Sequence, residues 1–148
     1  MGAARMNKFT FVPVPIPLIG PMWSKLSPHV LRVVDVAPDE VTLFSVKERA
    51  MKGETTLVTV LLEDEVVAVL TVEIRTFDSG NKALYLPIIG GDYLDEWMDD
   101  IMEGFKDIAK QKGCFQIRGI AARTGWKRKL KSRGWHVVHE VLALDIGA

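Results

Sequence analysis

The strongest pattern of hydrophobic and polar positions lies between Leu84 and Lys112. An apolar run over residues 83–89 breaks at Gly90-Gly91. Apolar side chains then recur at steps of three, one and three, which places them on one face of a helix of about five turns. They are Leu94, Trp97, Met98, Ile101, Met102, Phe105, Ile108 and Ala109. Gly113 is a typical left-handed helix end. This stretch predicts a strand, a glycine break and a long helix.

Another strand is predicted directly after this helix, over residues 114–121. A strand, a crossover helix and a strand predict parallel pairing, with the helix lying across the sheet. Where two such strands separate, the helix N-terminus offers free N–H groups and a partial positive charge. We therefore expect any ligand of this fold to lie near residues 88–95.

The rest of the chain predicts one α/β domain over residues 1–148. Residues 9–18, within a proline-rich stretch at 1–20, alternate proline with aliphatic residues, which predicts an extended edge segment. A proline-motif ligand is the weaker alternative. Helices are predicted to begin at Ser27-Pro28 and at Pro38-Asp39. Further strands are predicted at residues 55–62, 66–76, 82–89 and 135–146, and a short basic helix from about 124 to 132.

Composition narrows the classes of protein to which the chain can belong. Apolar residues make up 48% and charged residues 26% of the 148, which is typical of a globular chain. Lys plus Arg and Asp plus Glu are both 19, so no overall charge draws the protein to nucleic acid or to a membrane. The single cysteine, Cys114, excludes an internal disulfide and suits a reducing compartment. Prolines interrupt the N-terminal apolar run, so we expect no signal peptide and a cytoplasmic location.

The order of elements, together with a set of short motifs, resembles the GNAT-type N-acetyltransferases. The motifs are Gly90-Gly91, Trp97, Ala109, Gly113-Cys114, Arg123, Gly125-Trp126, Leu130 and Gly134-Trp135. In its C-terminal half the chain is similar to GNAT-like proteins encoded by bacteriophages and prophages. The resemblance implies a central mixed, mostly antiparallel sheet flanked by helices, with residues 84–135 forming the cofactor half.

The activity implied by this resemblance is transfer of an acetyl group from acetyl-CoA to an amine. The pantetheine would lie between the strands at 84–89 and 114–121, and the pyrophosphate would lie on backbone N–H groups of the following loop. The implied cofactor-binding residues are Ile88, Ile89, Gly90, Gly91, Tyr93, Leu94, Arg123 and Trp126.

The sequence departs from the family pattern at two points. The glycine-rich, basic phosphate loop is missing, and the acidic residues Asp92, Asp95 and Glu96 stand there instead. The family's tyrosine, which protonates the departing thiolate, is replaced by Leu130, so the general acid is unknown.

Two further candidates come from the residues themselves. Glu73, in the middle of a predicted strand, could act through water as the base for the acceptor amine, or could be a solvent-facing glutamate. Residues 126–135 hold five cations between tryptophans, which could bind an anion such as the CoA 3′-phosphate or the acidic helix, or could be a solvated face. His136 and His139 point to opposite faces of a strand, so we assign no metal site.

The sequence leaves two functions open. One is an acetyl-CoA-dependent acyltransferase acting on an unknown amine. The other is a catalytically silent GNAT-fold phage protein that acts in the virion, in assembly or by binding a host protein, in the host cytoplasm or the particle. Nucleic-acid binding rests on the basic helix alone, and the net charge of zero argues against it.

Overall fold

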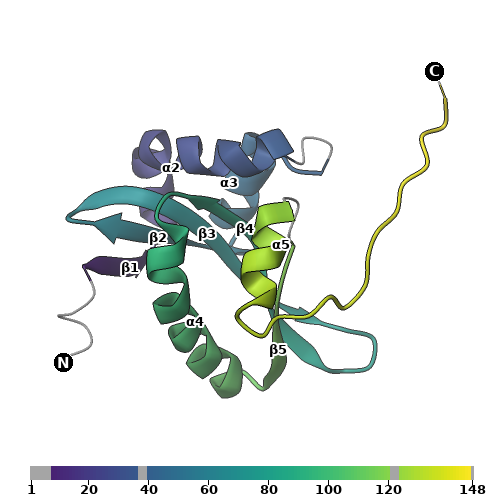
Figure 1. Cartoon of the computed structure of the whole chain (residues 1–148). Coiled ribbons are helices and arrows are strands. Elements are labelled where there is room, and N and C mark those ends of the chain that lie inside the picture. The colour runs from purple at the N-terminus through teal and green to yellow at the C-terminus, as the bar shows by residue number, and fades with distance from the viewer. Residues whose placement is uncertain (1–7, 37–39, 121–123, 148) are drawn as a thin grey trace.

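A computed structural model describes residues 8–36, 40–120 and 124–147 of the chain. Five strands form one sheet in the order β1-β2-β3-β4-β5, in which only the β4–β5 pair is parallel. Figure 1 shows α2 and α3 on one face of the sheet and α4 on the other, with α5 beside β4 and β5. The elements are β1 Phe9–Pro13, α2 Ile16–Val36, α3 Leu43–Met51, β2 Thr56–Leu62, β3 Glu65–Thr76, β4 Lys82–Gly91, α4 Leu94–Gln111, β5 Cys114–Gly119 and α5 Thr124–Lys131.

The sheet is buried on both faces, so the domain has two apolar cores. The α4-side core contains Trp97, Leu70 and Leu86, and the α2-side core contains Leu26 and Val69. The periodicity predicted for the long helix is confirmed, because six of its apolar side chains are buried. In the part of the chain that the structure describes, no helix is both long and apolar enough to cross a membrane.

The N-terminal region confirms one prediction and corrects another. β1 is an edge strand, and β2 is the only described strand that pairs with it. It ends at Pro13, however, and residues 16–18 of the predicted extended segment belong to α2. The first helix, however, begins at Ile16, and Ser27-Pro28 lies inside it rather than at its start. A proline inside a helix removes one backbone hydrogen bond. Burial of apolar side chains such as Leu26 and Val30 against the sheet outweighs that loss, which a local start signal could not reveal.

The second helix begins later than expected. Pro38-Asp39 lies outside the described residues, and α3 starts after Thr42. There the Thr42 hydroxyl accepts from the Ser45 N–H, and the Ser45 hydroxyl accepts from the Thr42 N–H, both at 3.0 Å. This reciprocal pair is a capping box with serine in place of the usual acidic or amide residue.

The central strands follow the prediction. β2 and β3 are joined at Glu63 and Asp64, whose φ angles of 50° and 70° match the tight turn that favours a two-stranded hairpin. β4 extends to Gly91, two residues beyond its predicted end.

The predicted final strand at residues 135–146 is not formed. After α5 the chain leaves the domain, and residues 136–147 run away from it without pairing to any described strand (Figure 1). Alternating apolar residues predict the capacity to form a strand, but a strand exists only where a neighbour accepts its hydrogen bonds.

We predict opposite effects of the same substitution at two glycines. At Gly91, where φ is +143°, a Cβ would lie 2.4 Å from Ala68 and from the Val67 carbonyl oxygen. Gly91→Ala should therefore lower the free energy of unfolding by at least about 2 kcal/mol. Gly104, exposed in α4 with nothing within 4 Å, is the control. Gly104→Ala should raise it by about 0.5–1 kcal/mol, measured by urea denaturation.

Equal effects at the two positions would contradict this account of the close approach between β3 and β4. The geometry also means that a bulky residue at Gly90 or Gly91 would test folding rather than ligand binding.

Candidate functional site

β4 carries one extra residue at Leu86–Pro87. Thr71 of β3 pairs with Ile88, yet Glu73 pairs with Tyr85, so two steps along β3 correspond to three along β4. This is a β-bulge, which bends a strand and redirects the side chains beyond it.

Because of the bulge, β4 side chains before and after it enter different cores. Leu84 and Leu86 face the α4-side core, whereas Ile88 lies in the α2-side core. Without the extra residue, all three would face the same side. Pro87 has no N–H to offer the ladder, and the Ile88 N–H donates to Thr71 Oγ1 at 3.1 Å. The buried threonine hydroxyl thereby replaces a backbone partner at the bulge.

β4 and β5 separate at the bulge. Their parallel ladder runs from Lys82 and Cys114 to Leu86 and Gly119, where β5 ends. β4 continues to Gly91, and in this part β3 is the only described strand that pairs with it. Among the described residues no strand pairs with this side of β4 in the stretch before the double glycine, where the sequence analysis expected the two strands to part. This stretch is called the gap between β4 and β5 below.

Backbone amides of β4 point into this gap. The N–H of Ile88 points to Thr71 and that of Asp92 donates to the Val67 carbonyl at 2.8 Å, so both face β3. Backbone groups alternate in direction along a strand. The N–H and C=O groups of Ile89 and Gly91 consequently face the side on which β5 has ended, where they can bind a ligand.

A cavity of about 510 Å³ lies where β4 passes into α4. It is lined by Gly91, Asp92, Tyr93, Leu94, Asp95, Glu96, Gly125 and Lys129. Tyr93, with φ 61° and ψ 26°, precedes the helix and provides no side-chain cap. The first-turn N–H groups of α4 therefore have no capping side-chain oxygen at this end.

Two carboxylates at this cavity are paired with cations from distant segments. Asp92 accepts from Arg32 of α2 at 2.8 Å, and Glu96 lies 3.7 Å from the Lys8 ammonium. These pairs are exposed and contribute little to stability. They nevertheless cancel much of the negative charge that the sequence places at the start of α4.

The third carboxylate joins α4 to the basic helix. Lys129 donates to Asp95 at 2.9 Å, and Arg133 donates to Asp99 at 2.9 Å while lying 3.7 Å from Asp95. The hydrogen bond from Lys129 is the largest cause that lowers the pKa of Asp95 below its usual value. The anion contacted by the basic residues is thus the acidic helix of the same chain, one of the predicted alternatives.

The residues expected to bind a cofactor divide into three groups. Gly91, Tyr93 and Leu94 line the cavity, and Ile89 adjoins the gap. Ile88 is buried in the α2-side core, so its side chain cannot reach a ligand in the gap. Gly90 lies against His29 of α2. Arg123 lies outside the described residues, as does the side chain of Trp126.

Two other side chains bear on the gap. The Tyr93 ring lies 6.0 Å from the Phe9 ring of β1, which directs it away from β5. Leu130, at the position of the family's tyrosine, is 8% exposed and packs in the α4-side core. No proton donor comes from that position.

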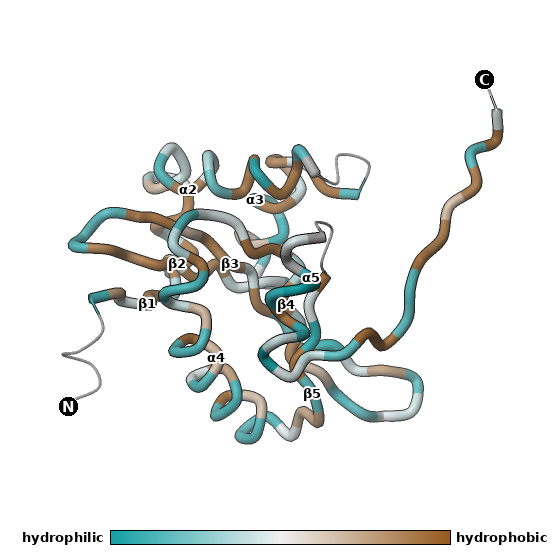
Figure 2. Tube along the Cα trace, viewed as in Figure 1, coloured by the Kyte–Doolittle hydropathy of each residue, from teal (hydrophilic) through white to brown (hydrophobic). Residues whose placement is uncertain are grey.

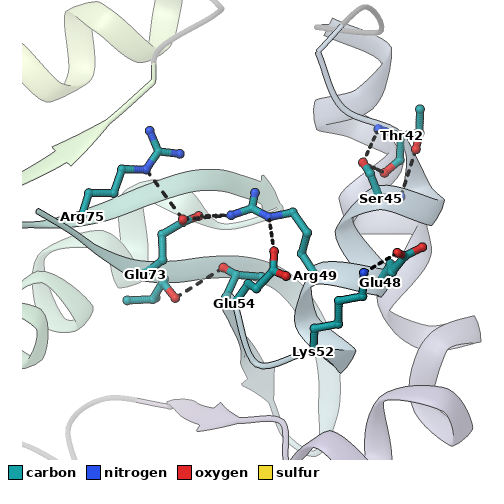
Figure 3. Close-up of polar contacts among 10 residues, drawn as sticks. Thr42, Ser45, Glu48, Arg49, Lys52, Glu54, Glu73 and Arg75 are labelled. Carbon is teal, nitrogen blue, oxygen red and sulfur yellow. Dashed lines mark hydrogen bonds and ion pairs between the residues drawn. The ribbon is translucent and has the colours of Figure 1, made fainter.

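Glu73 is neither free nor solvent-facing. Both of its carboxylate oxygens accept from Arg49 Nη2 of α3, at 2.9 and 3.1 Å, and Arg75 Nε lies 3.6 Å away (Figure 3). Its side chain is 10% exposed. The Arg75 guanidinium in turn lies 3.6 Å from the centre of the Tyr85 ring. An acceptor amine would have to share Glu73 with Arg49.

His29 connects α2 to β3 next to the double glycine. Its Nε2 donates to the Val66 carbonyl at 3.1 Å, and its Nδ1 has no hydrogen-bond partner among the described residues. Burial lowers the pKa of His29 from its usual 6.5, and nearby Arg32 lowers it too, while the Val66 carbonyl and Asp92 act in the opposite direction. The neutral imidazole is therefore favoured in the folded chain.

Sequence reasoning missed Thr71, Arg32 and Arg49, which the site brings in from β3, α2 and α3. The one available signal was Pro87, since a proline inside an apolar strand run marks an edge or a bulge. Within the described residues, no three His, Cys, Asp or Glu side chains gather as metal ligands would.

No protein-family model matches the chain, and no curated protein sequence is similar to it. Solved structures nevertheless match it over almost its whole length. A ribosomal-protein-alanine N-acetyltransferase from Brucella melitensis biovar Abortus has a TM-score of 0.69 at 10% identity, covering 94% of this chain and 99% of that one. The chain has the GNAT-type acetyltransferase fold.

Two further structures with this fold also match. A predicted acetyltransferase with acetyl-CoA from Clostridium acetobutylicum has a TM-score of 0.65 at 10% identity, covering 93% of this chain and 96% of that chain. An aminoglycoside acetyltransferase from an uncultured soil metagenomic sample, in complex with sisomicin, has a TM-score of 0.63 at 13% identity, covering 93% and 97%. The predicted fold class is confirmed, and identities this low establish the fold alone.

We predict that Glu73 stabilises the domain through Arg49. Glu73→Gln keeps the shape but removes the charge, and should lower the free energy of unfolding by about 1 kcal/mol, since Arg49 remains partly solvated. Glu48→Gln, which breaks an exposed pair with Lys52 in α3, is the control and should leave the urea midpoint unchanged. Equal midpoints for the two variants would show that the Glu73 pair is energetically neutral.

A second prediction concerns pH. Because the folded pKa of His29 is lowered, the unfolded chain binds the proton more readily, and the His29 contribution is complete above the unfolded value of 6.5. It decreases as pH falls below that value, until the folded pKa is reached. Urea denaturation between about pH 8 and pH 5 should show a steeper loss of stability for the wild type than for His29→Gln.

Above about pH 7.5 the two stability curves should run parallel, which serves as the internal control. A constant difference between them over the whole range would contradict a lowered His29 pKa.

Proposed function

We propose that the protein is a GNAT-type N-acyltransferase that moves an acetyl group from acetyl-CoA to an amine. The observation that carries this proposal is the end of the β4–β5 ladder at Leu86 and Gly119. It coincides with the bulge in β4, and the cavity at the start of α4 follows a few residues later. Outward backbone groups that no described strand pairs, leading to a helix N-terminus, suit an extended amide chain that ends in a diphosphate.

The chain's own groups fit such a cofactor. The outward N–H and C=O groups of Ile89 and Gly91 would bind the pantetheine amides as an added strand would. The first turn of α4 would bind the pyrophosphate through its N–H groups and dipole. Lys129 lines the cavity and is 45% exposed, so it can exchange Asp95 for a phosphate oxygen.

The acceptor amine would approach from the face that carries α3. Glu73 points to that face and pairs with Tyr85, immediately before the bulge, so its register places it next to the gap. We assign Glu73 the role of base, acting through water while Arg49 holds it in position. Rate enhancement would come mainly from holding the two reactants together, an effect of up to about 7–11 kcal/mol.

The leaving thiolate has no protein donor at the position of Leu130. The cavity is bordered by exposed residues, including Asp95 and Lys129, so water reaches it and can supply the proton. This arrangement is consistent with a slow enzyme that depends on positioning more than on acid catalysis.

The alternative is a catalytically silent GNAT-fold protein. The observation that favours it is the pairing at the cavity, where Arg32, Lys129 and Arg133 each already bind a carboxylate. The relation to bacteriophage GNAT-like proteins that we proposed from the sequence, and with it a role in a virion or on a host protein, belongs to this alternative.

Calorimetric titration with acetyl-CoA distinguishes the two functions. We expect micromolar affinity for the wild type. Lys129→Gln should weaken it about tenfold by removing a phosphate partner, a change of about 1.4 kcal/mol. Asp95→Asn should strengthen it, because it releases Lys129 and removes a negative charge beside the diphosphate. No binding at millimolar acetyl-CoA would falsify the acyltransferase proposal.

The matched controls are Lys131→Gln in α5 and Asp100→Asn in α4, which make the same changes on exposed residues outside the cavity. Both should leave affinity unchanged.

Acetylation of an amine panel, including a peptide with N-terminal alanine and an aminoglycoside, would then identify the acceptor by mass spectrometry. With an acceptor known, Glu73→Gln should reduce turnover while retaining affinity for acetyl-CoA.

A further inference from the structure

β3, β4 and β5 place a row of polar side chains across the sheet face that carries α3. Glu73 pairs with Tyr85 in the antiparallel ladder, and Tyr85 pairs with Arg118 in the parallel one. Residues directly opposite each other in neighbouring strands point to the same face of a sheet. Because Glu73 bonds to Arg49 of α3, the three side chains of the row lie on the α3 side.

The α2-side core does not extend to this row. Its buried sheet residues are Leu57, Val69 and Ile88. Figure 2 shows how β3 changes along its length, from a hydrophobic middle to a more hydrophilic end at the hairpin with β4. Tyr85 and Arg118 are only half-buried, so a small molecule in solvent can reach both side chains.

Arg118 is held in place without a carboxylate. Its Nε donates to the Gln116 side-chain oxygen at 2.9 Å, and its guanidinium lies 4.4 Å and 5.8 Å from the centres of the Phe77 and Phe115 rings. No carboxylate among the described residues forms an ion pair with it. Its Nη1 and Nη2 groups, which carry most of the N–H donors of a guanidinium, bond to no described residue and can bind a ligand.

The other guanidinium groups on this face already have counter-ions. Arg49 pairs with Glu73 and lies 3.6 Å from Glu54, and Arg75 lies 3.6 Å from Glu73 (Figure 3). Among these side chains and Arg118, three guanidinium groups therefore face two carboxylates. A partly buried cation without a counter-ion costs free energy, which an anionic ligand would offset. A planar carboxylate matches the paired donors of a guanidinium.

The row lies next to the gap between β4 and β5. Tyr85 and Arg118 directly precede Leu86 and Gly119, where the pairing of the two strands ends. Glu73 and Arg118 are two strand spacings apart, about 10 Å between their Cα atoms. A water at Glu73 and a direct hydrogen bond at Arg118 each occupy about 3 Å. A molecule that contacts both therefore has its amine and its anion only a few bonds apart.

We propose that the acceptor is a small amine that carries a carboxylate, as a free amino acid does, and that Arg118 binds this carboxylate. The proposal rests on the acyltransferase function above and names the substrate class of the same site. The neutral amine nitrogen bonds to the thioester carbonyl carbon while the C–S bond breaks. The proton of the nitrogen passes through water to Glu73, and the thiolate takes a proton from water. The carboxylate takes no part in these bond changes, so Arg118 determines specificity.

Matched acceptors test the proposal on the unaltered protein. The common amino acids and their amides, assayed with saturating acetyl-CoA, form pairs that differ only in the carboxylate. At least one amino acid should have a kcat/KM about tenfold or more above that of its amide, because only the acid can form charge-assisted hydrogen bonds to Arg118. Amine reactivity works in the opposite direction, since the neighbouring carboxylate favours the protonated, unreactive amine.

Arg118→Gln should abolish this preference. The KM of the amino acid should rise about tenfold with little change in its kcat, while the kcat/KM of the amide and the affinity for acetyl-CoA stay the same. Arg118→Lys keeps the charge without the planar fork and should recover part of the preference. Lys110→Gln, an exposed change in α4 on the opposite side of the sheet, is the control and should retain the full preference. The urea midpoint of each variant shows whether it is folded.

Failure of this proposal is distinguishable from failure of the acyltransferase function. A protein that does not bind acetyl-CoA would contradict both. A protein that binds acetyl-CoA, yet acetylates the amides as fast as the amino acids or acetylates neither, would overturn the carboxylate assignment and retain the cofactor. Weaker acetyl-CoA binding by Arg118→Gln would overturn the assignment as well, because Arg118 would then contact the cofactor instead of the acceptor.

Discussion

The extra residue at Leu86–Pro87 is the constraint on which the rest of the site depends. An uninterrupted β4 would direct Leu84, Leu86 and Ile88 to one face. The bulge instead lets the strand fill the α4-side core with its first half and the α2-side core with Ile88. It needs the Thr71 hydroxyl, because a buried N–H without a partner costs about 1–3 kcal/mol. Leu86 and Pro87 thus determine the packing on both faces of the sheet and lie where pairing between β4 and β5 ends.

Electrostatics at the gap then follow from the packing. With β4 redirected, Gly90 and Gly91 lie against His29 and Ala68, so α2 approaches closely enough for Arg32 to reach Asp92. On the other side, α5 lies close enough to α4 for Lys129 to reach Asp95. A cavity that looks strongly acidic in the sequence is therefore close to neutral in the fold. Such exposed pairs are weak and can be exchanged, which leaves their cations available to an anionic ligand.

The sequence predicted those features that follow from local periodicity or turn chemistry. These include α4, the β2–β3 hairpin, the edge position of β1 and the end of the β4–β5 ladder before the double glycine. It did not predict where α2 begins, because two prolines inside that helix are tolerated only through its burial on the sheet. The sequence could not predict the partners of Glu73 either, since Arg49 comes from another element and its approach depends on tertiary packing. Periodicity also overstated the last strand, because alternation predicts the capacity to pair and not whether the pairing forms.

One edge of the sheet and the candidate site share β5. β5 pairs with β4 only as far as Gly119, and no described strand pairs with its other edge. A six-residue strand that is paired on one side only has low local stability, although it borders the candidate binding gap. A strand added to the outer edge would fix β5 against the sheet and, with it, the width of the gap beside Ile89. Main-chain hydrogen bonds would carry that constraint across β5 to the gap without any contact to a ligand.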